Sequence, residues 1–258
     1  MAKGMVSCKL AGRLGNFLFE VANVYAYAKR CGLQYEIYCP TGSEQEQYKI
    51  LFPNIPFTET LISAPIFKEA SHAYNEIPKY DRVVFDGYFQ SYKYFDDCHD
   101  EIINDLFKFS NEPVKRVSIH VRRGDYVQYQ DAFPLCNMDY YSKSVNAFIE
   151  SGIEDFTVFS DDIEWCKRQF SQLKGNFNYS EKATPWEDMQ AMANHEHNII
   201  SNSSFSLWAA MANRNKNKVV IAPHAKTNWF GAKTRLNTKD MLPESFLQVQ
   251  FDYNRRWA

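Results

Sequence analysis

The second half of the chain alternates short runs of β-branched and aromatic residues with segments that have helical spacing of apolar positions. The apolar runs are residues 116–121, 156–160, 197–201 and 218–222. The first three are followed by amphipathic segments, and a capping box formed by Thr184 and Glu187 marks one further helix. Strands that alternate with helices of this length predict βαβ units and a parallel sheet.

The first half opens in a similar way and then changes its rhythm. A strand near residues 5–10 precedes the glycine-bearing turn AGRLGN and a helix from Asn16 to about Gly32. Proline-punctuated segments follow, with a strand at 82–89 and a helix at 94–107. The polar, proline-containing stretch 110–115 is a candidate linker. The pattern therefore predicts two α/β domains, 1–112 and 113–258.

Polar residues gather where the four strands of the second half end, in the sequences HVRRGD, FSDD, ISNSS and IAPH. Ligands of open parallel α/β sheets bind outside the carboxyl ends of the strands. Four polar strand ends in order therefore predict a binding site at this edge of the sheet.

The two arginines of HVRRGD are expected to have different roles. Successive side chains of a strand point to opposite faces, so Arg122 shares a face with His120 while Arg123 points away. A guanidinium can donate two parallel hydrogen bonds to a phosphate. We expect Arg122 to bind a diphosphate and Arg123 to brace the loop against Asp125. Internal ion pairs for both arginines are the alternative, and an RGD adhesion role is disfavoured because the tripeptide follows a core strand.

The other strand ends offer complementary groups. Ser203 is a predicted N-cap, and Ser204 and Ser206 lie near a helix start, where free N–H groups and the helix dipole favour anions. Asp161 can cap the next helix, or Asp161 and Asp162 can bind a base or ribose; a Mg²⁺ site is a less favoured alternative. The HEH sequence at 195–197 lacks a third ligand, so no metal site is predicted there.

Composition narrows the possible functions. The chain has 258 residues, 45% of them hydrophobic, and 29 basic against 31 acidic residues, for a net charge of −2. This balance disfavours nucleic acid as a partner. The six cysteines form no CxxC pair, which indicates reduced thiols. Without a signal sequence or an apolar run of membrane-spanning length, we expect a cytoplasmic protein with no transmembrane segment.

In the first half, the turn GRLGNFLFE is a distant variant of the dinucleotide-binding GxGxxG and lacks its third glycine. The alternative interpretation is a tight turn followed by an Asn16 helix cap.

Five motifs taken together resemble those of the α-1,2-fucosyltransferases of glycosyltransferase family 11. They are GRLGN (12–16), DGYFQSYKYF (86–95), HVRRGDY (120–126), FSDD (159–162) and HNIISNSSFSLWAA (197–210). The resemblance extends to about residue 231. It departs from the usual pattern at Phe17, where the family often has glutamine, and at the NHEH sequence of 194–197.

The resemblance implies two facing Rossmann-like domains of the GT-B type, in a compact version, with the donor bound mainly by the second domain. It implies inverting transfer of L-fucose from GDP-β-L-fucose to the 2-hydroxyl of a terminal β-galactoside, with no metal and no other cofactor. Two rival hypotheses are a metal-dependent glycosyltransferase that uses Asp161 and Asp162, and a non-catalytic GDP-sugar or glycan-binding protein.

On this basis we expect Arg122, Asp125 and Asn16 to take part in catalysis. Asp125 is a candidate general base, with Asp131 as a second candidate and no base at all as a third possibility. The expected donor-binding residues are Arg13, Asn16, His120, Arg122, Arg123, Asp161, Asp162, Ser203, Ser204, Phe205 and Ser206.

Overall fold

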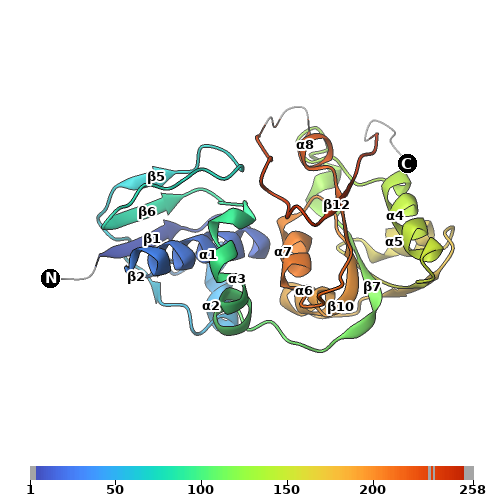
Figure 1. The fold of residues 1–258 in the computed structure, drawn as a ribbon, viewed down its shortest axis with the longest axis horizontal. Coiled ribbons are helices and arrows are strands. Elements are labelled where there is room, and N and C mark those ends of the chain that lie inside the picture. Colours follow the sequence, from blue (N-terminus) through green and yellow to red (C-terminus); the bar gives the residue numbers. More distant parts are fainter. Residues whose placement is uncertain (1–3, 232–233, 235, 253–258) are drawn as a thin grey trace. The chain divides into compact units, whose positions relative to one another are not determined.

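A computed structural model describes residues 4–231, 234 and 236–252 of the chain. It contains two compact units (Figure 1). The first unit comprises the residues up to Phe109 together with Asn237–Leu242, and the second comprises Ser110–Leu236 and the residues from Pro243 onward. The sequence placed the boundary at 112 and missed the returning segment; the outer ends of its two ranges, 1–3 and 253–258, lie outside the described residues.

The returning segment joins the first unit through hydrogen bonds. Ser91 Oγ donates to the Asp240 carbonyl at 2.8 Å, and Lys93 Nζ lies 2.6 Å from Asp240 Oδ1. Met241 is fully buried. These contacts are between residues distant in sequence, so local patterns could not reveal them.

The first unit is built on a parallel sheet with strand order β4-β3-β1-β6-β5, in which β2 also pairs with β1. Its strands are β1 (Met5–Lys9), β2 (Gln34–Tyr35), β3 (Ile37–Tyr38), β4 (Phe57–Thr58), β5 (Ile66–Lys68) and β6 (Arg82–Asp86). Its helices are α1 (Leu14–Cys31), α2 (Tyr48–Leu51) and α3 (His99–Glu101), with 3₁₀ turns at Glu44–Gln47, Tyr92–Tyr94 and Asp96–Cys98 and a π-helical turn at Ile102–Leu106.

Helix α1 ends as the sequence predicts and begins earlier. Gly32 takes the left-handed conformation with φ of 65°, a conformation that glycine adopts without a Cβ penalty. Arg13 is the N-cap residue, so Asn16 lies inside the first turn and the predicted Asn16 cap is wrong. The predicted helix at 94–107 is divided into short turns, because Phe95 and Cys98 have non-helical backbone angles.

The second unit has a six-stranded parallel sheet with the order β12-β11-β10-β7-β8-β9. The strands are β7 (Val114–Val121), β8 (Asp155–Ser160), β9 (Asn176–Tyr179), β10 (His195–Ile199), β11 (Val220–Pro223) and β12 (Leu247–Val249). The helices are α4 (Met138–Glu150), α5 (Ile163–Phe170), α6 (Pro185–Ala193), α7 (Ser204–Ala212) and α8 (Ala225–Asn228), with a 3₁₀ turn at Gly124–Val127. Counted within this unit the strand order is 6-5-4-1-2-3, the order of the Rossmann fold.

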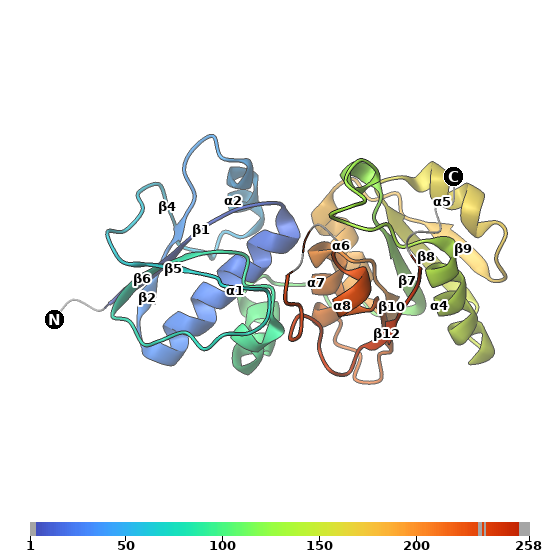
Figure 2. The same cartoon turned by 90° about the horizontal axis from the view of Figure 1, so that it is seen from above.

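Different helices cover the two faces of this sheet (Figure 2). Val117, Ile119 and Phe156 belong to a core cluster with residues of α4 and α5. On the other face, Asn198 Nδ2 donates to Ser118 Oγ at 2.7 Å and to the carbonyl of Met192 in α6 at 2.8 Å. The predicted fold class, α/β with Rossmann-like parallel sheets and flanking helices, is confirmed. The sequence missed β9 and β12, which are short and carry few β-branched residues.

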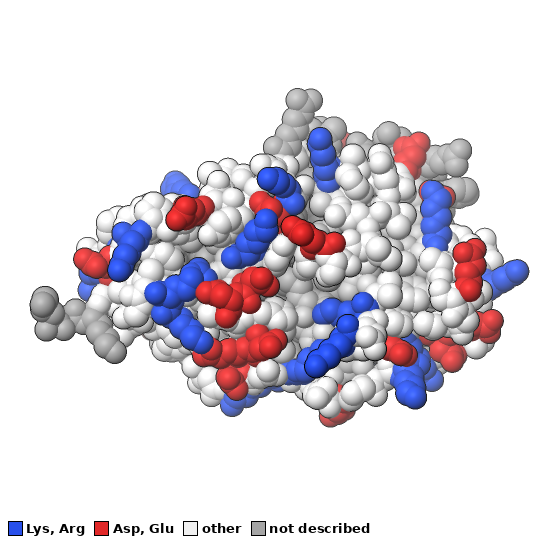
Figure 3. Space-filling view, viewed as in Figure 1, with Lys and Arg blue, Asp and Glu red and all other residues white. Residues whose placement is uncertain are grey.

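None of the described helices is both long and apolar enough to cross a membrane. On the face shown in Figure 3, basic and acidic side chains are interspersed. All six cysteines, which are within the described residues, are free thiols.

Candidate active site

From β7, the sheet of the second unit extends to one side through β8 and β9 and to the other side through β10, β11 and β12. The switch point of the strand order therefore lies between β7 and β10. Ligands of doubly wound sheets bind in the crevice at such a point. The ends of these two strands are joined there, since His120 Nδ1 lies 2.8 Å from Ser201 Oγ. Burial, with a smaller contribution from Arg122, lowers the pKa of His120 to about 3, so its ring is neutral at pH 7.

Arg122 follows β7 directly and lies between two carboxylates. Its Nη2 donates to Asp125 Oδ1 and its Nη1 donates to Asp161 Oδ2. The guanidinium also lies 5.2 Å from the centre of the Tyr126 ring. Arg122 therefore forms the internal ion pairs that the sequence analysis gave as the alternative to phosphate binding. These pairs hold its planar guanidinium at the carboxyl edge of the sheet.

Arg123 points to the other side of the strand, as the alternation of side chains predicts. Its Nε donates to Asp162 Oδ2 at 2.9 Å, and its guanidinium stacks 4.0 Å from the centre of the Trp165 ring. Arg123 therefore braces the loop against Asp162 and α5; the prediction that it does so against Asp125 is wrong, because Asp125 lies on the Arg122 side.

Of the two aspartates of FSDD, the one that caps α5 is not the one that the sequence suggested. Asp162, not Asp161, is the N-cap of α5, and its side chain accepts from Trp165 N at 3.2 Å. Burial alone would raise the pKa of Asp162, but its hydrogen bonds with Arg123 and Trp165 N lower that pKa below the ordinary value. Asp161 Oδ1 instead accepts from the backbone N–H of Arg123 at 2.8 Å and of Gly124 at 3.1 Å.

The N-terminus of α7 lies after β10, on the other side of the switch point. Ser203 is its N-cap and accepts from Phe205 N at 3.4 Å, which confirms the predicted cap. The Phe205 ring centre is 5.3 Å from that of His120. Ser206 is fully buried, and its hydroxyl donates to backbone carbonyls of Ser201 and Ser203 at 3.4 and 3.3 Å. Its hydroxyl thus fixes the turn.

No three His, Cys, Asp or Glu side chains within the described ranges are grouped so that they could hold a metal ion. Asp161 and Asp162 instead hold the loop after β7 through the arginines and backbone N–H groups described above.

The first unit has a polar edge of its own at the carboxyl end of β1. Gly12 has φ of 72° and its carbonyl accepts from Gln45 Nε2 at 2.7 Å. Asn16 Oδ1 accepts from Gln90 Nε2 at 2.7 Å. The predicted residues Arg13 and Asn16 belong to this unit, whereas all the other predicted site residues belong to the second unit.

Buried carboxyl groups lie next to this edge, and no sequence motif indicates their role. The backbone N–H of Ala11 donates to Glu20 Oε1 and Oε2 at 3.0 and 3.2 Å. Burial raises the pKa of Glu20 well above its ordinary value, and the nearby Glu69 and Asp86 carboxylates raise it further. Glu69 Oε2 accepts from Tyr88 N at 2.8 Å. Gln90 could have been found from its place in the DGYFQ motif; Glu20 and Glu69 had no such signal.

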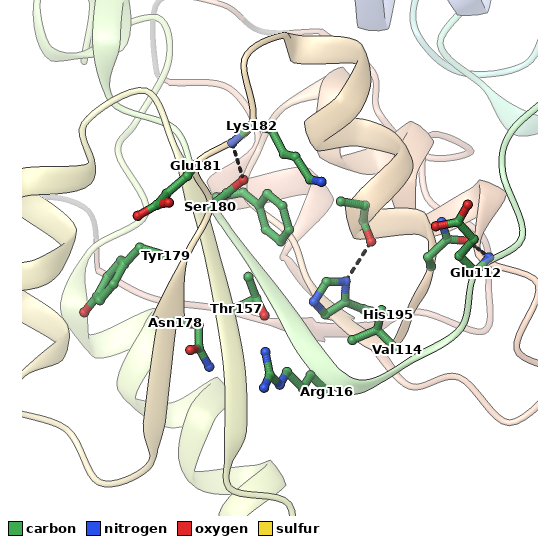
Figure 4. Close-up of a pocket in the computed structure, with 13 residues that line it drawn as sticks. Glu112, Val114, Arg116, Thr157, Asn178, Tyr179, Ser180, Glu181, Lys182 and His195 are labelled. Atoms are coloured by element: carbon green, nitrogen blue, oxygen red, sulfur yellow. Dashed lines mark hydrogen bonds between the residues drawn. The ribbon is translucent and has the colours of Figure 1, made fainter.

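A cavity of about 360 Å³ lies elsewhere in the second unit (Figure 4). It lies beside β7, β8 and β9, between the start of β7, the segment after β9 and the end of α6. Neither Arg122 nor the aspartates of FSDD line it.

Sequence and structure comparisons find similar proteins among known glycosyltransferases. The chain is 28% identical to an Escherichia coli alpha-1,2-colitosyltransferase over 95% of this chain and 99% of the relative. It is 24% identical to the Mus musculus galactoside 2-alpha-L-fucosyltransferase Sec1 over 81% of this chain and 64% of the relative. A crystal structure of fucosyltransferase NodZ from Bradyrhizobium covers 81% of this chain and 92% of its own at 13% identity, with a TM-score of 0.49.

A family model described as "Glycosyl transferase family 11" matches residues 1–240. The protein is therefore a glycosyltransferase. It belongs to glycosyltransferase family 11.

Proposed function

We propose that the protein transfers L-fucose from GDP-β-L-fucose to the 2-hydroxyl of a terminal β-galactoside, with inversion and without a metal ion. The family match and the similarity to a galactoside 2-alpha-L-fucosyltransferase support this reaction. The observation that carries the proposal is the Arg122 fork, held by Asp125 and Asp161 at the switch point of a Rossmann-type sheet.

In this proposal the β-phosphate of the donor replaces a carboxylate at the Arg122 fork. Breaking the bond between fucose C1 and the phosphate oxygen leaves negative charge on the diphosphate. The guanidinium and the N–H groups at the start of α7 offset that charge as it develops. The galactose oxygen forms the new bond to C1 from the opposite side, and its proton must pass to a base.

Asp125 is the proposed base. Its carboxylate is paired with Arg122, and binding of phosphate to the guanidinium releases it from that pair. A carboxylate freed when the donor binds is suited to accept the hydroxyl proton of the acceptor. Asp161 remains anchored by the backbone N–H groups of Arg123 and Gly124, so it keeps the loop in place while Asp125 acts.

Colitose is a second candidate for the transferred sugar. The match to the alpha-1,2-colitosyltransferase extends over nearly the whole of both chains. This similarity makes colitose a candidate for the sugar that the protein transfers. The two reactions make the same linkage and differ in the sugar transferred. Because colitose has one oxygen fewer than fucose, the masses of the two products differ.

The test is a mass-spectrometric assay with GDP-fucose or GDP-colitose, EDTA and a panel of β-galactosides. We expect galactose to gain one deoxyhexose in the presence of EDTA, and no product from acceptors that lack the 2-hydroxyl. Loss of activity in EDTA would favour a metal-dependent enzyme. Donor binding without transfer or hydrolysis of the donor would favour a GDP-sugar-binding protein.

A further inference from the structure

The cavity beside β7, β8 and β9 has the size of a ligand site, and two cations extend into it. Its volume of about 360 Å³ lies within the range of roughly 300–1,000 Å³ typical of small-molecule pockets. Figure 4 shows the side chains of Arg116 and Lys182 extending into it from opposite sides, whereas the carboxylate of Glu181 points away. Glu112 lies at its border.

Its two cations, Arg116 and Lys182, extend into the cavity without a salt bridge from the described part of the chain to hold them. No salt bridge joins Arg116 or Lys182 to a carboxylate among the described residues, whereas Arg122 and Arg123, at the other end of β7, are both paired. Arg116 is exposed although it lies in β7, the central strand of the sheet. Two unpaired cations that face one cavity favour an anionic occupant.

A buried imidazole supplies a different kind of contact. His195 is 4% exposed, and its Nδ1 lies 2.7 Å from the Ala191 carbonyl. A carbonyl can only accept, so Nδ1 carries the proton and Nε2 is an acceptor. Burial lowers the pKa of His195 to about 4, and the charge of Arg116 contributes to a smaller extent, while the hydrogen bond to Ala191 acts in the opposite direction. The ring is therefore neutral at pH 7.

His195 Nε2 is buried and has no hydrogen-bond partner among the described residues. In Figure 4 it faces Thr157 and Arg116. Buried acceptors are nearly always satisfied, so a donor group is missing at this position. A ligand that suits the cavity therefore combines an anionic group with an O–H or N–H donor.

We propose that this cavity binds a small phosphomonoester, separately from the diphosphate site at Arg122. The Arg116 guanidinium binds the phosphate through its two parallel donors, and a hydroxyl or ring N–H of the ligand donates to His195 Nε2. A sugar phosphate and a nucleoside monophosphate share this chemistry. Such a site lets a metabolite act on the enzyme without occupying the donor site.

The test is calorimetric titration of the whole chain with fucose 1-phosphate, GMP and inorganic phosphate, with and without saturating GDP. The variants are Arg116→Gln and, as a matched control, Lys174→Gln, which replaces an exposed cation of the same unit outside the cavity. We expect fucose 1-phosphate or GMP to bind in the presence of GDP, and Arg116→Gln to weaken that binding by about tenfold or more. Lys174→Gln should leave it unchanged.

Three results would overturn the proposal. Competition between GDP and the monoester, or loss of GDP affinity in Arg116→Gln, would make the cavity part of the donor site. Inorganic phosphate that binds as tightly as the esters, or binding that does not depend on Arg116, would indicate an adventitious ion only. Absence of binding by all three probes would remove the site. If GDP itself does not bind, the proposed transfer reaction fails, while titration without GDP still tests Arg116.

Discussion

Gln90 Nε2 donates a hydrogen bond of 2.7 Å to Asn16 Oδ1, and the two residues are 74 positions apart in the chain. The bond joins the first turn of α1 to the segment after β6. It fixes the amide of Asn16 with its Oδ1 toward Gln90, so that Nδ2 is turned toward Gly12. Gln90 is therefore a positioning residue for Asn16, which we expect to contact the donor.

The first prediction concerns this pair. Asn16→Ala and Gln90→Leu should each lower kcat/KM, and the double variant should lose little more than Asn16→Ala alone, because Gln90 acts through Asn16. Interacting residues of this kind show coupling of about 0.5–3 kcal/mol in double-mutant cycles. Transfer kinetics on all four proteins measure the coupling. Additive losses would mean that Gln90 has no role in positioning Asn16.

The second prediction concerns the Arg122 fork. Arg122→Lys keeps a positive charge but cannot form two parallel hydrogen bonds with a phosphate. We expect kcat to fall by about 10²- to 10³-fold, the usual cost of losing one preorganised donor. Arg168→Lys, a surface arginine of α5, is the control and should keep full activity. An Arg122→Lys enzyme with normal kcat would exclude the phosphate role.

The third prediction separates the two possible roles of Asp125. If Asp125 is the base, Asp125→Asn should fold normally and bind GDP, yet lose most of its transfer to galactoside. Slow hydrolysis of GDP-fucose should survive, since the Arg122 fork and α7 remain. If the variant transfers fucose at the wild-type rate, Asp125 only pairs with Arg122, and Asp131 becomes the next residue to replace.

The sequence predicted four of the six strands of the second unit, β7, β8, β10 and β11, because these form apolar runs, and it placed several helix starts. Thr184 and Ser203 are N-caps as expected, and the Thr184 capping box is complete. The partner of each charged side chain was harder to predict. Asp161 and Asp162 are adjacent, and the local pattern did not show that Asp162 caps α5 while Asp161 accepts from the backbone N–H groups of the loop after β7.

The first unit was less predictable because its site depends on contacts between distant segments. The Asp240 contacts with Ser91 and Lys93, and the Gln90 bond to Asn16, link residues with no shared periodicity. Glu20 has the spacing of an apolar position on α1, and its polar character gives no hint that it accepts from Ala11.

The fourth prediction follows from His120, whose pKa is lowered to about 3 by burial. The unfolded chain takes up a proton near pH 6.5 and the folded chain does not, so stability present above pH 6.5 is lost as the pH falls toward 3. Between pH 7 and 5 the loss from His120 is about 2 kcal/mol. Urea unfolding of wild type and His120→Gln should show this difference in pH dependence. Equal slopes would mean that His120 titrates normally.

The last prediction concerns Glu20 and has the opposite sign. Its pKa is raised by burial, so the folded protein holds a proton that the unfolded chain has already lost above about pH 4.5. Stability from this group therefore falls as the pH rises, by at most about 1.4 kcal/mol for each pH unit. Glu20→Gln keeps an oxygen that can accept from Ala11 but has no proton to lose. Its stability relative to wild type should increase in urea unfolding as the pH rises above about 4.5. Glu59→Gln, at an exposed site of the same unit, should show no such trend. A Glu20→Gln variant that is equally destabilised at every pH would show that the carboxyl group is needed for its hydrogen bonds and that its ionisation carries no cost.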